Sequence, residues 1–439
     1  MRRPSLPRSP RPVRIGAAAV GVVVALAALT VVLYRVFAPH ETLTRPTVAY
    51  PEQELITDER PFSELRAAPL VVEGRLRVYA EKWRVWSDAP VGGRYEATPY
   101  WAYRRWPAQV VGVVTATTPG GPVVVSRWSD GEIVALDARR GEVAWRMLGP
   151  DPERRYEGRR TGATTVYEPE TLLTASNGAG AVIIVTGPTT VHGFNAATGA
   201  KLWDRALPAG CRPAAWTGST VLALPDCDGS SVAFVGAASG RDLGWWTPPV
   251  AGARAATAAP APALCAIGRS DCQFVTVNEE AWRLADDGTL TSVPALERGA
   301  RLAGDRIVYP TADGIAARRL TESTPLWSWR GKGTLVAADA AGAYLLTDDL
   351  IVLGLSPVTG RLSVVGCATS IPDEHWRLGH VYPTGGGYLA LERLSKNGSP
   401  ADGDQQYFYG PRPMALVELY PPTKLPVWPG KFAACSPPV

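Results

Sequence analysis

The residues that could do chemistry are few and far apart in this chain of 439 residues. Its four histidines are His40, His192, His375 and His380. Four residues separate the last two, a spacing that does not place two metal ligands on one face of a helix. The six cysteines form no CxxC or CxxCH motif and no Cys/His cluster with zinc spacing. The sequence therefore predicts no metal or haem site.

Motifs for other reaction types are also missing from the sequence. No GxSxG motif marks a nucleophilic serine. Asp286 and Asp287 stand in a turn context, and the glycines at 385–387 precede an expected strand, whereas a phosphate-binding loop is followed by a helix. We predict no catalytic residues and no cofactor, so a binding protein is favoured over an enzyme.

The segment TPYWAYRRWP concentrates aromatic and cationic side chains, the types enriched at protein interfaces. We take five of them as a candidate interaction patch: Trp101, Tyr103, Arg104, Arg105 and Trp106. Two interpretations are open. The segment is either an exposed recognition surface, or a strand whose rings fill the gap between neighbouring sheets.

A hairpin pattern shows which elements position these residues. Residues 131–146, GEIVALDARRGEVAWR, predict two strands joined by a tight turn, and residues 194–203, FNAATGAKLW, repeat the pattern. The matching positions of the two copies hold a turn-forming Asx, a glycine suited to positive φ, and a Trp four residues later. These structural repeat residues are Asp137, Gly141 and Trp145, then Asn195, Gly199 and Trp203.

Weaker copies follow, and the turn positions 141, 199, 240, 288, 323, 360 and 424 recur about every 47 residues, a spacing typical of propeller blades. We expect the second set to begin with a strand over 164–175 and the last hairpin to span 415–428. Residues 70–86 and the tail 431–435 would supply an eighth blade. We predict an all-β, eight-bladed β-propeller, with seven blades as the alternative; an immunoglobulin-type array would need longer modules.

The N-terminus predicts a membrane anchor. Residues 15–34 carry no charge and would span about 30 Å as a helix, the thickness of a bilayer core. Five arginines precede this run, which favours a cytoplasmic N-terminus and an exported remainder. A cleaved signal peptide is the competing interpretation. We expect a basic cytoplasmic tail (1–14), a single transmembrane helix (15–35), an extracytoplasmic stalk (36–67) and the propeller (68–439).

The cysteines agree with export, because all six follow the apolar run and disulfides form in oxidising compartments. Proximity suggests three pairs, one of 15 possible connectivities: Cys211 with Cys227, Cys265 with Cys272, and Cys367 with Cys435. The last pair would fix the end of the chain to an earlier blade.

The motif ALDARRGEVAW, echoed by GFNAATGAKLW, resembles the blade repeat of PQQ-type (quinoprotein-like) β-propellers. The resemblance covers residues 68–435 and implies the propeller fold. Dehydrogenases of this family hold pyrroloquinoline quinone and calcium in a central funnel, beside a disulfide between adjacent cysteines. No two cysteines are adjacent here, so the chain is more similar to the non-catalytic scaffold branch, although it has a transmembrane segment instead of a lipobox cysteine.

These observations predict a membrane-anchored, extracytoplasmic protein-interaction scaffold of the bacterial cell envelope. We expect an envelope protein as its partner. Nucleic acid is not expected, because six arginines lie in the first 35 residues and the remainder is close to neutral. The alternatives are a PQQ-dependent dehydrogenase and a ligand-binding sensor domain.

Overall fold

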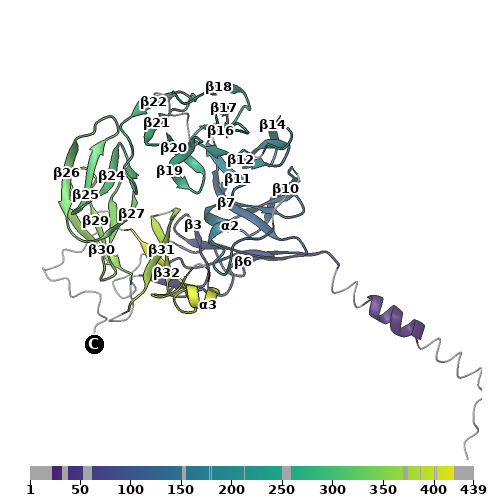
Figure 1. The fold of residues 1–439 in the computed structure, drawn as a ribbon. Coiled ribbons are helices and arrows are strands. Elements are labelled where there is room, and N and C mark those ends of the chain that lie inside the picture. The colour runs from purple at the N-terminus through teal and green to yellow at the C-terminus, as the bar shows by residue number, and fades with distance from the viewer. Residues whose placement is uncertain are drawn as a thin grey trace, which may run out of the picture.

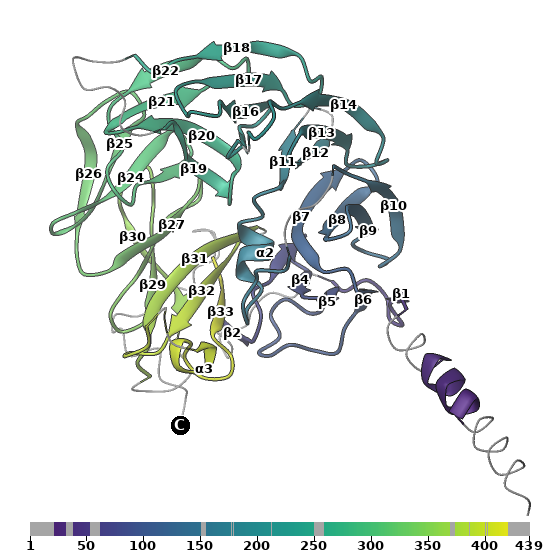
Figure 2. The same ribbon diagram turned by 45° about the vertical axis from the view of Figure 1, so that its right-hand side comes forward.

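The fold is a ring of eight antiparallel sheets (Figures 1 and 2). The computed structural model describes residues 22–31, 38–52, 62–150, 155–176, 178, 180–211, 213–249, 259–368, 374–385, 387–399, 401 and 403–419. The first strands of successive blades contact one another and lie nearest the centre of the ring. The prediction of an eight-bladed propeller is confirmed.

Each of the first four blades contains four consecutive strands. Blade 1 has β3 (Leu70–Val72), β4 (Leu76–Glu81), β5 (Arg84–Asp88) and β6 (Trp101–Trp106), and blade 2 has β7 (Val110–Thr118), β8 (Gly121–Trp128), β9 (Glu132–Asp137) and β10 (Val143–Leu148). Blade 3 has β11 (Leu172–Ser176), β12 (Ala181–Thr186), β13 (Thr190–Asn195) and β14 (Lys201–Ala206). Blade 4 has β15 (Trp216–Thr217), β16 (Val221–Pro225), β17 (Val232–Gly236) and β18 (Asp242–Trp246).

The second half of the chain forms the other blades. Blade 5 has β19 (Ala261–Ile267), β20 (Ser270–Val277), β21 (Glu280–Leu284) and β22 (Leu290–Val293), and blade 6 has β23 (Arg301–Ala303), β24 (Arg306–Thr311), β25 (Gly314–Arg319) and β26 (Pro325–Arg330). Blade 7 has β27 (Thr334–Ala338), β28 (Ala343–Leu346), β29 (Ile351–Leu355) and β30 (Leu362–Cys367). Blade 8 has β31 (Arg377–Gly385), β32 (Tyr388–Leu394) and β33 (Met414–Glu418), with the short helix α3 (Asp404–Tyr407) between the last two.

Two N-terminal strands complete the ring and lie inside the stretch 36–67, for which the sequence predicts a stalk. β2 (Phe62–Leu65) pairs with β33 as the outer strand of blade 8, and β1 (His40–Thr44) pairs with β6 as a fifth strand of blade 1. The fourth strand of the last blade therefore comes from the N-terminal segment, which differs from the hairpin expected over 415–428. Blade 1 takes its own fourth strand from the candidate patch. The tail 431–435 lies outside the described residues.

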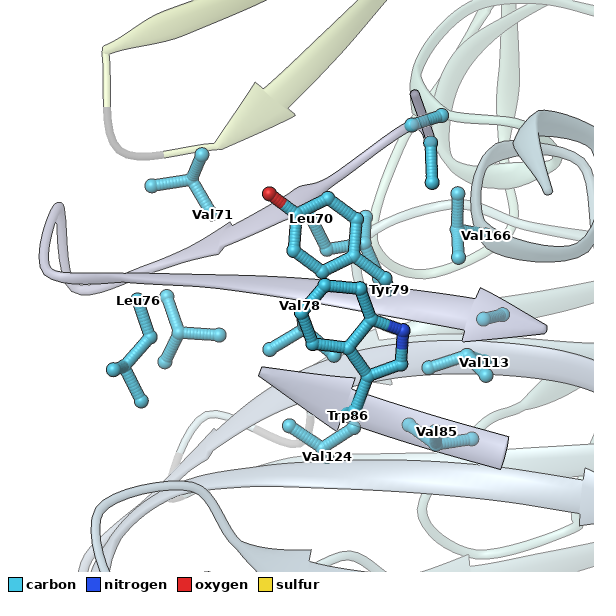
Figure 3. Close-up of a cluster of buried hydrophobic side chains, with 14 of the residues drawn as sticks. Leu70, Val71, Leu76, Val78, Tyr79, Val85, Trp86, Val113, Val124 and Val166 are labelled. Carbon is cyan, nitrogen blue, oxygen red and sulfur yellow. The ribbon is translucent and has the colours of Figure 1, made fainter. Parts of the chain in front are cut away.

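Hydrophobic side chains on both faces of the inner strands pack between neighbouring sheets. In blade 1, Val78 and Val85 are fully buried, and so is Tyr79, which stacks on Trp86 with ring centroids 4.4 Å apart (Figure 3). Both faces of a blade are therefore buried near the centre of the ring, as required when sheets cover one another.

The repeat residues join neighbouring blades at several places in the ring. Trp145 of blade 2 donates its indole N–H to the carbonyl of Ala196 at 2.8 Å, and its ring covers Gly199 at the β13–β14 turn, where an added Cβ would lie 2.7 Å from the ring. Gly199 has φ +73°, which glycine adopts at little cost. The same contact joins four blades to the turns of the blades that follow them: Trp101 covers Gly141, Trp145 covers Gly199, Trp203 covers Gly240, and Trp327 covers Gly360.

The acidic or amide residue at each of the two clearest turns holds the turn itself. Asp137 Oδ1 accepts the backbone N–H groups of Arg139 and Arg140 at 2.9 and 3.0 Å. Asn195 Oδ1 does the same for the amides two and three residues ahead of it, at 2.9 and 3.1 Å. These are Asx turns, as the sequence pattern predicts.

Blade 4 departs from the repeat. After the bulge in its last strand pair, Gly244 lies opposite Phe234, at the position that Trp145 occupies opposite Ala135 in blade 2. Trp245 is one residue further along the strand and is 64% exposed. A one-residue shift in a strand moves a side chain to the opposite face.

Two of the expected disulfides are present, Cys211–Cys227 and Cys265–Cys272. The second joins directly opposed residues of the β19–β20 hairpin. Cys435, the expected partner of Cys367, lies outside the described residues.

At the N-terminus, residues 22–31 are helical. Within the part of the chain that the structure describes, no helix has the length and apolar character needed to cross a bilayer.

Candidate functional site

The centre of the ring is occupied by the chain itself. The segment between blades 2 and 3 forms α2 (Ala163–Tyr167), which packs against the inner strand β7 and lies among the first strands of the blades (Figure 2). Val166 and Tyr167 are buried, and the Tyr167 ring stacks on Tyr382 of β31 at 4.4 Å. The Tyr167 hydroxyl donates a hydrogen bond to the carbonyl of Pro69. This helix replaces the first part of the strand expected over 164–175.

The turn between β19 and β20 reaches the same place. An added Cβ on Gly268 would lie 2.4 Å from the carbonyl oxygen of Tyr167, so the turn lies directly against the end of α2. The cavity left among Val166, Leu70 and Ile267 has a volume of about 30 Å³. Pockets that hold small molecules are about 300–1,000 Å³. The residues around α2 therefore do not fit a bound pyrroloquinoline quinone.

The histidines are placed apart from one another. His40 lies on β1, His192 on β13 and His380 on β31, with His375 before that strand. His380 Nδ1 lies 3.1 Å from Glu392, and this hydrogen bond raises the pKa of the imidazole. Among the described residues, no group of three or more His, Cys, Asp and Glu side chains has a metal-binding arrangement.

The candidate interaction patch is strand β6, and strand alternation divides it between two faces. Trp101 and Tyr103 are fully buried toward blade 2, where Trp101 donates to the carbonyl of Ala138 at 2.8 Å and Tyr103 packs edge-on against Trp128. For these two residues, the structure matches the interpretation in which rings fill the gap between sheets. Trp101 is the repeat Trp of blade 1.

Arg105 lies on the same face of β6 and is surrounded by carboxylates. It forms ion pairs with Asp130 at 2.9 Å, with Glu132, and with Glu41 of β1 at 3.8 Å. Arg146 of blade 2 also binds Glu41, at 2.7 Å, and this contact holds the pKa of that carboxyl below its ordinary value. Arg105 is thus a structural residue that helps to fix β1 to blades 1 and 2.

Arg104 lies on the other face of β6 and is exposed. It lines a groove of about 610 Å³ between the outer strands of blade 1 and the loop 155–160. Trp106 is partly buried and packs edge-on against Trp83, whose side chain also lines this groove, with ring centroids 5.0 Å apart. Of the five patch residues, the structure therefore brings only Arg104 to an open surface. Trp106 is partly buried and packs against a residue that lines the same groove.

The groove is strongly cationic. Besides Arg104, it is lined by Lys82, Arg84, Arg159 and Arg160, and the one carboxylate among its lining residues is Glu81. Tyr156 adds an aromatic wall, and burial raises the pKa of its hydroxyl to about 12, so this side chain stays neutral. The sequence pattern pointed to Arg104 but missed the other cations, because they come from separate segments and form no motif.

A second exposed feature is Trp245 on β18, and Leu243 of the same strand is 42% exposed. Exposed tryptophans are uncommon outside binding surfaces. The signal in the sequence is small. Trp245 follows the turn glycine Gly240 by five residues, whereas Trp145 and Trp203, which cover a glycine of the next blade, follow the turn glycines of their own hairpins by four.

Seven four-stranded blades and one five-stranded blade, with Trp–Gly contacts at four of the junctions between neighbours, define a propeller of the PQQ-like repeat class. The chain belongs to the PQQ-like repeat family described as "Outer membrane protein assembly factor BamB", whose model matches residues 54–236 and 129–370. No curated protein matches the chain in sequence.

Solved structures with a similar arrangement share little sequence with the chain. BamB from Moraxella catarrhalis is 14% identical with a TM-score of 0.41, and the match covers 85% of this chain and all of that one. The dihydro-heme d1 dehydrogenase NirN has 14% identity and a TM-score of 0.41, covering 81% and 74%. A europium-containing methanol dehydrogenase has 11% identity and a TM-score of 0.39, covering 79% and 86%. Similarity at this level does not indicate an activity.

Proposed function

We propose that the protein is a membrane-anchored, non-catalytic scaffold of the bacterial cell envelope that binds another envelope protein. The observation that carries the proposal is the filled centre of the ring. In this fold a cofactor or small ligand would be held where the first strands converge, and here α2 and the β19–β20 turn occupy that space. The outer surface of the ring is then the part left for function.

The anchor in this proposal is the apolar run 15–34, with the N-terminus in the cytoplasm and the propeller outside it. The uncharged length and the five preceding arginines support this topology. The Cys211–Cys227 and Cys265–Cys272 disulfides also support this topology, because disulfides form in oxidising compartments.

The partner contact is assigned to the outer strand of blade 4. Trp245 offers a large ring to solvent, whereas Trp145 and Trp203 are used in blade-to-blade contacts. Leu243 of the same strand is also partly exposed, although its side chain lies against the turn glycine Gly288 of blade 5. A protruding Trp is the side chain type that most often contributes a large share of binding energy at protein interfaces.

The test is site-specific photo-crosslinking in cells that make the full chain. A photoreactive phenylalanine analogue replaces Trp245, and the control replaces Leu148, an equally protruding residue of blade 2 that is 76% exposed. We expect a reproducible crosslinked envelope protein from position 245 and none from position 148. Extraction at alkaline pH should leave the chain in the membrane fraction. Absence of a reproducible crosslink would overturn the scaffold role, and release by alkali would overturn the anchor.

A further inference from the structure

The groove of blade 1 has a row of paired residues as its floor. Across four neighbouring strands, Thr42 of β1 lies opposite Arg104 of β6, which lies opposite Arg84 of β5, which lies opposite Glu81 of β4. Directly opposed residues in a sheet project from the same face. Glu81 binds Arg84 at 2.6 Å and accepts the indole N–H of Trp86 at 2.9 Å. The one carboxylate among the groove's lining residues therefore pairs with Arg84, and it forms no ion pair with Arg104 or Lys82.

The facing wall holds two arginines in fixed positions. Arg159 packs over the ring of Tyr407 at 4.8 Å and pairs with Asp404 at 3.3 Å. Arg160 donates to the carbonyl of Pro411 at 2.8 Å. These contacts orient the planar guanidinium groups while leaving part of their N–H donors for a ligand, so less side-chain freedom is lost on binding.

Arg104 and Lys82 are the cations available to a ligand. Both are exposed, and neither forms an ion pair with any described residue. Lys82 lies over the ring of Trp83 with its Nζ 4.9 Å from the centroid. Arg104 differs in this respect from Arg105, the next residue of the same strand. Three carboxylates surround Arg105 on the other face of β6. The arginine on one face of β6 is neutralised by carboxylates of the protein, whereas the arginine on the other face forms no ion pair with a described residue.

We propose that this groove binds the phosphate of an anionic lipid headgroup. Arginine guanidinium groups bind phosphate oxygens through paired N–H donors, and a volume of about 610 Å³ accommodates a headgroup with the aromatic walls Trp83 and Tyr156 beside it. The lipid source rests on the proposed anchor. β1 starts at residue 40, so at most about 18 Å of extended chain separates it from the end of the expected transmembrane helix at residue 35.

The test is binding to the full chain in uncharged detergent, measured by titration calorimetry. The probes are short-chain phosphatidylglycerol, short-chain phosphatidylcholine, inorganic phosphate and a hexaglutamate peptide. We expect phosphatidylglycerol to bind most tightly and its affinity to fall as salt is raised. Arg104→Gln and Lys82→Gln should each weaken that binding about tenfold or more. Arg140→Gln, at an exposed arginine of the blade 2 turn, should leave it within about twofold.

Each other result contradicts part of the proposal. Inorganic phosphate binding as tightly as the lipid would overturn the lipid as the source of the phosphate. Hexaglutamate binding in preference to both would overturn the phosphate itself and assign the groove to an acidic peptide. Equal binding by the three variants would overturn the site. Because the measurement is made in detergent, failure of the anchor is detected separately by the alkaline extraction.

Discussion

Trp145 in blade 2 and Trp245 in blade 4 come from similar hairpins and have opposite environments. Trp145 is 8% exposed, covers Gly199 and donates to a carbonyl of the next blade, whereas Trp245 is 64% exposed. The two strands differ by one residue in the distance from turn to Trp. Register therefore decides whether the same residue type joins two blades or faces solvent.

The turn glycine in the blade that follows each Trp also has a different environment in the two cases. Gly199 lies under the ring of Trp145, while Gly288 of blade 5, the corresponding turn glycine after blade 4, contacts Leu243 and Phe234 instead. The comparison separates two classes of tryptophan in this ring. The docked class holds neighbouring blades together, and the protruding class is free to bind another molecule.

The largest effect is expected from Trp145→Ala. Removing the ring leaves a cavity between blades 2 and 3 and an unpaired carbonyl at Ala196. We expect the free energy of unfolding to fall by about 3–5 kcal/mol. Denaturant unfolding of the full chain in detergent, followed by tryptophan fluorescence and circular dichroism, measures the change. A loss below about 1 kcal/mol would contradict the docked role of Trp145.

An intermediate effect is expected from Gly199→Ala compared with Gly288→Ala. Both glycines have positive φ, at +73° and +84°, so both variants bear the cost of placing alanine in that conformation. At Gly199 the new methyl also meets the Trp145 ring at 2.7 Å, whereas the nearest atom at Gly288 is a Cβ at 3.2 Å. The first variant should lose about 1–3 kcal/mol more than the second. Equal losses of unfolding free energy by the two variants would show that the Trp–Gly contact does not explain the difference between the two turns.

The smallest effect on stability is expected from Trp245→Ala. Because the side chain is mostly in solvent, the free energy of unfolding should change by less than about 0.5 kcal/mol. The same variant should lose the partner captured by crosslinking, which a structural role would not explain. A destabilisation approaching that of Trp145→Ala would show that both tryptophans belong to the docked class.

The architecture was largely predictable because the repeat is defined by residues that form a local turn. Asp137, Gly141 and their counterparts determine a hairpin with no help from distant residues, and the recurrence of that hairpin indicates a ring. The outer strands of blade 8 and blade 1 were assigned differently from the sequence. β2 and β1 are short, and their partners β33 and β6 are identified by long-range pairing alone.

The candidate site was harder to predict because it depends on which face a residue takes. The patch at 101–106 was recognised by composition, but alternation along β6 buries Trp101 and Tyr103 and exposes Arg104. Residues 164–167 fall in the strand expected over 164–175, yet they form part of α2, where burial of Val166 and Tyr167 at the ring centre outweighs local preference. Arg159 and Arg160 reach the groove from a loop with no periodic pattern.

The pairing of β2 with β33 also sets an order of events when the chain is made. Phe62 and Val417 lie directly opposite each other in the sheet although they are about 350 residues apart, so the early strand must wait for nearly the whole chain before its partner exists. Until then blade 8 lacks its outer strand and the ring is open, with unpaired strand edges at the seam. A chain interrupted before residue 414 cannot close, and such products would present those edges to other chains.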